Sequence, residues 1–343
     1  MINFRFHLVS LVAVFLALAL GVVVGSTVID KAIVDRLSSQ IDSVRARADE
    51  QRAENRTLRD QVKGLETFIV QSQPQVVGRR LNQVPVTVVA VRGVPAEDVR
   101  GAVDILRQAG ALVSGVLWIE DAFSAPEPAA RTKLVEAMGD SGLATDDLRL
   151  VALEALGKRL VAGPGPAAAT PLPTSSTAPS SSSLSSASSA DPLVALNEAG
   201  LVSFDRLGGG TVNLESWPAA GTRILLVDGS QARPLPGTVS LPMLRAAAAA
   251  GGRLALAEVF RPTATVKDRG AIVRGVRDDP TLSRVVSTVD DLDNTRGQVA
   301  LTLAVQELGT GRAGHYGEGP GATSHLPTPE AAPPEGVPAA TAR

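Results

Sequence analysis

The chain has 343 residues, a formal net charge of −2, 3% aromatic residues and no cysteine. Its near-neutral charge, without a Lys/Arg-rich run interleaved with aromatic residues, argues against a nucleic-acid-binding protein. The lack of cysteine excludes disulfides, a lipidated cysteine and thiolate metal sites, so the stability of one or two globular domains must come from burial.

The amino-terminal segment contains an apolar run that is long enough to cross a membrane. Ser10 is the only polar side chain between positions 8 and 24. About 20 apolar residues span a hydrocarbon core of roughly 30 Å. The run continues well past the A-L-A triplet at positions 17–19, which could be read as a signal-peptidase site. We therefore predict a short cytoplasmic tip and an uncleaved anchor over residues 1–29.

The charges that flank this run predict its orientation. Arg5 precedes it, whereas Lys31 after it lies between Asp30 and Asp35. Positive charge is retained on the cytoplasmic side of a membrane span. We therefore expect a single-pass protein with a cytoplasmic amino terminus and the bulk of the chain in the cell envelope outside the cytoplasm.

Residues 30–73 follow with apolar side chains in a 3-4 alternation over five heptads, which is typical of a coiled coil. Asn55 falls at position a, where a single Asn fixes the register of two-stranded parallel coils. We predict a parallel homodimer or a hetero-coiled-coil partner. The alternative is a helix that packs on its own domain, because Ala48, Gln51 and Asn55 form a weak layer. The predicted interface comprises Val34, Leu37, Ile41, Val44, Asn55, Leu58, Val62 and Leu65.

The rest of the chain alternates between β-branched runs and helical stretches, which predicts an α/β domain in two parts, residues 84–162 and 191–317. Interleaved strands and helices favour a doubly wound (Rossmann-like), mostly parallel sheet of about five strands. The predicted strands are 85–92, 111–120, 223–229, 253–260 and 284–291; the predicted helices are 94–110, 129–138, 146–160, 240–252, 266–276 and 295–309.

Two segments have the composition of disordered chain. Residues 163–190 are rich in Ser, Pro and Ala and interrupt the domain between its second and third predicted strands. Such a segment cannot bury enough apolar surface to offset its ordering entropy. Residues 318–343 are rich in Pro, Gly and Ala and are predicted to form a flexible tail.

The sequence lacks the motifs of common catalytic sites. The first strand-to-helix turn, VRGVPAED, has no dinucleotide-binding glycines, and no phosphate-binding loop or G-x-S-x-G motif occurs. A Ser-His-Asp site would need a histidine that the predicted sheet does not supply. We therefore expect a protein that is not an enzyme and has no cofactor.

Four carboxylates mark a possible ligand edge. Asp228, Asp290, Asp291 and Asp293 follow or end predicted strands, and ligands of parallel sheets bind at the carboxyl ends of the strands. Carboxylates placed there could hold Mg²⁺ or bind a ligand. The alternative is that Asp293 or Asn294 caps the last helix while the others are solvated.

Metal ligands are sparse. The three methionines are far apart in the chain, and the histidines outside the anchor region are His315 and His325. These two histidines could bind a metal weakly, although isolated histidines are more often ordinary surface residues.

Two stretches carry a family resemblance. The opening MINFRFHLVSLVAVFLALALGVVVGS and the closing STVDDLDNTRGQVALTLAVQELGTGRAGHYG resemble the actinobacterial family named for mycobacterial copper transport protein B. The resemblance implies an envelope protein in copper efflux or tolerance, sometimes described as an outer-membrane channel, and it is the only indication of copper. The residues themselves also suit a coiled-coil scaffold or regulator of cell-wall remodelling or cell separation that acts through a protein partner.

Overall fold

The computed structural model describes residues 4–124, 128–164, 191–207, 212–233, 237–263 and 267–328, with the backbone alone for 26–33. The chain divides into two compact units, Met1–Phe68 and Ile69–Arg343. Most of the predicted Ser-rich insertion and the end of the predicted tail lie outside the described residues.

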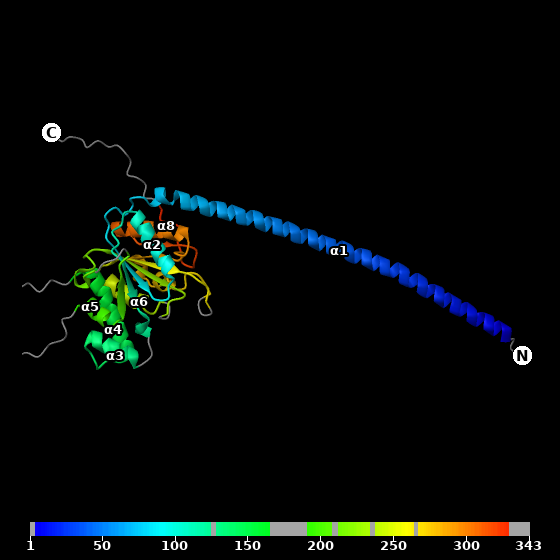
Figure 1. The fold of residues 1–343 in the computed structure, drawn as a ribbon, viewed down its shortest axis with the longest axis horizontal. Coiled ribbons are helices and arrows are strands. Elements are labelled where there is room, and N and C mark those ends of the chain that lie inside the picture. The colour runs from blue at the N-terminus through cyan, green and yellow to red at the C-terminus, as the bar shows by residue number, and fades with distance from the viewer. Residues whose placement is uncertain are drawn as a thin grey trace, which may run out of the picture. The chain divides into compact units, whose positions relative to one another are not determined.

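The helix α1 runs without a break from Phe4 to Val77 (Figure 1). Its part Phe4–Gly25 has a mean hydropathy of 2.8 and is long and apolar enough to cross a membrane, as the apolar run predicts. The helix extends past the expected end at residue 73 and includes Pro74. The amide of Gly78 then donates to the carbonyl oxygen of Pro74 at 3.0 Å.

The second unit contains a seven-stranded sheet in the order β3-β2-β1-β4-β5-β6-β7. All neighbouring strands are parallel except β2 and β3, which are antiparallel. The mostly parallel α/β fold is therefore confirmed, whereas the expected number of about five strands is wrong because β3 and β7 were missed. The strands are β1 Val86–Val91, β2 Val116–Ile119, β3 Val202–Asp205, β4 Arg223–Gly229, β5 Arg253–Val259, β6 Val286–Val289 and β7 His315–Tyr316.

Helices cover both faces of this sheet. Every residue of β1 is buried, and successive side chains of a strand point to opposite faces, so neither face is open there. The helix α2 packs against α8, and α4 packs against α3 and α6 (Figure 1). The helices are α2 Ala96–Gln108, α3 Ala129–Met138, α4 Thr145–Ala162, α5 Pro192–Glu198, α6 Ser240–Ala249, α7 Arg274–Arg277 and α8 Thr295–Glu307.

The predicted helix over residues 266–276 is largely wrong. The only helix there within the described residues is the short α7. The carboxylate of Glu258 accepts the backbone N–H groups of Gly270 at 2.9 Å, Ile272 at 2.9 Å and Val273 at 3.1 Å. These bonds hold the segment as a turn, because a side chain that binds amides competes with the helical ladder.

The predicted start of the flexible tail at residue 318 is too early. The amide of Gly317 donates to the carbonyl of Ser324 at 3.0 Å, and the amide of Thr323 donates to the carbonyl of His315 at 2.8 Å. The chain after β7 thus turns back and pairs with that strand. Paired backbone amides fix a segment regardless of its Pro and Gly content.

Candidate functional site

The predicted ligand-edge carboxylates lie at the carboxyl ends of neighbouring strands. Asp228 belongs to β4, and Asp290 and Asp291 directly follow β6. Between them, β5 contributes Glu258, whose Cα pairs with that of Asp228. Glu258 is fully buried. The sequence did not single it out, because a lone glutamate within the run RLALAEVF gives no signal beyond that of a buried strand.

Asp228 holds the start of α6. Its carboxylate accepts the amides of Gly229 at 2.7 Å and Gly237 at 3.1 Å, and the hydroxyl of Ser240 also donates to it. Burial raises the pKa of Asp228, and these three hydrogen bonds oppose that shift. The carboxylate of Asp228 is thus bound by groups of the segment that runs from the end of β4 to the start of α6.

Asp290 forms a buried ion pair with Arg277. Arg277 Nη1 lies 2.9 Å from Asp290 Oδ2, and the two side chains are 2% and 0% exposed. Asp290 also accepts the amides of Glu318 at 2.8 Å and Gly319 at 3.0 Å. Arg277 donates in addition to the carbonyl of Tyr316 at 2.9 Å. The pair therefore attaches the segment after β7 to the edge of the sheet.

Asp291 and Asp293 are paired with different arginines. Asp291 lies 3.1 Å from Nε of Arg296, and Asp293 lies 2.6 Å from Nη1 of Arg269. Asn294 caps α8 by accepting the amide of Gly297 at 2.9 Å, as one alternative predicted. The other part of that alternative is wrong, because Asp290 and Asp291 are fully buried rather than solvated.

This edge is thus a network in which carboxylates bind backbone amides and arginines of the same chain. Asp291 Oδ1 is buried and has no hydrogen-bond partner among the described residues. Within the part of the chain that the structure covers, no three or more His, Asp or Glu side chains are grouped so that they could hold a metal ion. The hydrogen bonds and ion pairs of this network fix the loops at the carboxyl ends of the strands.

A charge-removing variant tests that structural role. Burial opposes ionisation of Asp293, but hydrogen bonds from Arg269 and Phe260 outweigh it and hold the pKa below its usual range. A lowered pKa gives stability that is present above the unfolded pKa and is lost as the pH falls through the folded one. We expect Asp293→Asn to lower the free energy of unfolding by about 2 kcal/mol at pH 7. In denaturant titrations the difference from wild type should shrink below about pH 4; a constant difference would refute the ionic contribution.

The two candidate metal-binding histidines lie in different settings. His315 is half-buried in β7, and its Nδ1 lies 3.0 Å from the hydroxyl of Thr288. That hydroxyl also accepts Nε–H of Arg277 at 2.9 Å. Burial and then the charge of Arg277 lower the pKa of His315. His325 is exposed, and a metal role for either stays a prediction.

The predicted coiled-coil interface lies on α1 with its apolar side chains exposed. The seven apolar members are between 42% and 63% exposed, with Ile41 the least and Leu65 the most. Asn55 donates one amide hydrogen to the carbonyl of Gln51 at 2.8 Å. Its side-chain oxygen and second hydrogen remain able to pair across a helix interface.

Comparison with known proteins connects the chain to copper transport proteins. The family model described as "Copper transport outer membrane protein, MctB" matches residues 1–327. Proteins named Copper transporter MctB from Mycobacterium tuberculosis and Mycobacterium bovis are 27% identical over 341 residues, which covers 94% of this chain and 98% of theirs. The protein of that name from Mycobacterium leprae is 27% identical over 344 residues with the same coverage. The similarity thus includes the apolar segment, α1 and the sheet.

Proposed function

We propose, from the premise that the chain belongs to the MctB family of copper transport outer membrane proteins, that it is a non-enzymatic, membrane-anchored envelope protein that contributes to copper efflux or envelope permeability. The apolar part of α1, Phe4–Gly25, supports the anchor. Arg5 before this span supports a cytoplasmic amino terminus. The remaining chain would then act in the cell envelope.

The observation that carries the mechanism is the exposed apolar face of α1 between Val34 and Leu65. Among the described residues, one helix is long and apolar enough to span a membrane, and one such helix cannot enclose a pore, because a membrane channel needs several helices or a closed barrel. A role in permeation would therefore require an assembly of several chains. We propose that this face pairs two copies in a parallel coiled coil, with Asn55 fixing the register.

A second candidate function is a scaffold or regulator of cell-wall remodelling or cell separation. The same α1 face would then recruit a protein partner. The composition favours this alternative, because Cu(I) prefers clusters of Cys or Met and the chain has no cysteine and three widely separated methionines. Copper sensitivity would in this case follow indirectly from an altered envelope.

Copper content of cells that lack the chain separates the two functions. We expect such cells to accumulate copper and to grow poorly at raised copper, and wild type to restore both. Leu58→Asp, present in the membrane at the same level, should fail to restore them because it interrupts the α1 face. Thr57→Asp adds the same charge at a position outside the a and d series and should restore both. Normal copper content together with unseparated cells would support the scaffold instead.

A further inference from the structure

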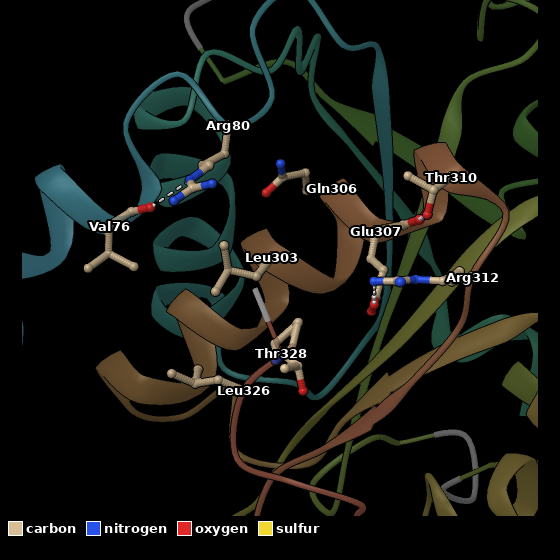
Figure 2. A pocket seen from close by; sticks show the side chains of 10 residues that line it. Val76, Arg80, Leu303, Gln306, Glu307, Thr310, Arg312, Leu326 and Thr328 are labelled. Atoms are coloured by element: carbon tan, nitrogen blue, oxygen red, sulfur yellow. Dashed lines mark hydrogen bonds and ion pairs between the residues drawn. The ribbon is translucent and has the colours of Figure 1, made fainter. Parts of the chain in front are cut away.

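A groove of about 580 Å³ lies beside the end of α8 (Figure 2), and none of the carboxylates at the strand ends lines it. Its walls come from three places in the second unit: the last turn of α1 with the loop after it, the last turns of α8, and the segment after β7. Its volume falls in the range of small-molecule sites, roughly 300–1,000 Å³.

One part of the groove is apolar. Val76 from the end of α1, Leu303 from α8, and Leu326 and Pro327 from the segment after β7 line it. Val76 is 36% exposed and Leu326 is 38% exposed. Covering these side chains with an apolar ligand would remove hydrocarbon surface from water, which is favourable.

The other part of the groove carries one excess positive charge. Glu307 is neutralised within the protein, because one carboxylate oxygen lies 2.7 Å from Arg312 and the other accepts the hydroxyl of Tyr316. Arg80 instead donates Nε–H to the carbonyl of Val76 at 3.1 Å. No described acidic side chain forms an ion pair with Arg80, so its two terminal nitrogens are free to bind an anion.

The side chain of Gln306 lies beside Arg80 in Figure 2. A guanidinium and an amide placed next to each other can share the two oxygens of a carboxylate. The apolar side chains Leu303 and Leu326 also line the groove and lie farther from Arg80 in Figure 2. A head group held at Arg80 would thus leave an attached hydrocarbon chain against the apolar wall.

We propose that this groove binds a single-chain amphiphile with one carboxylate head, of the fatty-acid type. The head pairs with Arg80 and Gln306, and the chain lies along Val76, Leu303 and Leu326. A cationic head would be repelled by Arg80, and a neutral head would leave its charge unpaired. This assignment is independent of copper and of the coiled coil.

Calorimetric titration of the full chain with decanoate tests the proposal. The protein is held in phosphatidylcholine nanodiscs, and empty nanodiscs provide the signal for partition into lipid. We expect saturable binding of one decanoate per chain above that background. Acetate, which lacks the apolar chain, and decanol, which lacks the charge, should each bind at least tenfold more weakly. Partition alone would overturn the proposal.

Three variants locate the site. Arg80→Gln removes the charge-assisted hydrogen bonds and should weaken decanoate binding roughly ten- to a hundredfold without affecting decanol. Leu326→Ser should weaken both ligands. Arg100→Gln on α2, which removes an exposed arginine elsewhere, should leave both unchanged. Unchanged decanoate binding in Arg80→Gln would overturn the assignment. So would efficient disulfide cross-linking between copies of Leu326→Cys, because it would identify a second copy as the occupant.

Discussion

Arg277→Leu is expected to lower the free energy of unfolding of the full chain by about 3–5 kcal/mol, because it leaves the buried carboxylate of Asp290 without its countercharge. The two side chains lie 2.9 Å apart and are almost completely buried. A loss of this size is a large fraction of the stability of an ordinary domain. Denaturant titration with tryptophan fluorescence would measure it on the second unit, which contains both tryptophans.

The same variant should loosen the segment after β7. Arg277 donates to the carbonyls of Tyr316 and Pro320, each at 2.9 Å, and these bonds disappear with the guanidinium. We expect faster proteolysis between residues 317 and 328 under native conditions. Arg274→Leu is the matched control, since Arg274 lies in the same short helix and is exposed; it should change neither property. A loss below about 1 kcal/mol in Arg277→Leu would show that the pair is not the anchor of this segment.

The strands with long, largely apolar runs could be predicted from the sequence. The strands within PVTVVAVR and RLALAEVF are buried on both faces apart from Arg253, and such strands read as continuous apolar segments. The strand β7 escaped prediction because it has only two residues. The strand β3, V-S-F-D, escaped it because its polar residues leave no continuous apolar run and only its first residue is buried. The helix expected over 266–276 failed for a tertiary reason, since a glutamate in a different strand binds the amides of that segment.

The placement of the acidic edge could be predicted, but its partners could not. Residues that end parallel strands share one edge of a sheet, so the positions of Asp228 and Asp290 follow from the strand assignment. Asp290, however, is neutralised by Arg277 and binds amides of residues 318 and 319. No local pattern links these residues, which the fold alone brings together. The predicted coil residues are exposed along α1. Their pairing with a second helix stays a prediction.

Leu58→Asp is expected to raise the dissociation constant of the proposed homodimer at least about a hundredfold. Leu58 is 52% exposed on α1, and in a parallel coil the two copies of a d residue face each other. Burial of each leucine contributes about 1.5–3 kcal/mol, and two carboxylates would repel each other at the same point. A total of about 3 kcal/mol corresponds to a factor of more than a hundred in the dissociation constant.

Sedimentation of the full chain in detergent over a range of concentrations measures this effect directly. Wild type and Thr57→Asp should sediment as dimers, because Thr57 lies at position c and faces away from the interface. Leu58→Asp should sediment as a monomer at the same concentrations. Asn55→Leu should make the assembly more stable or change the number of chains, since a buried Asn at position a favours two-stranded coils at some cost in stability. A wild-type monomer, or dimers that persist in Leu58→Asp, would rule out pairing through this face.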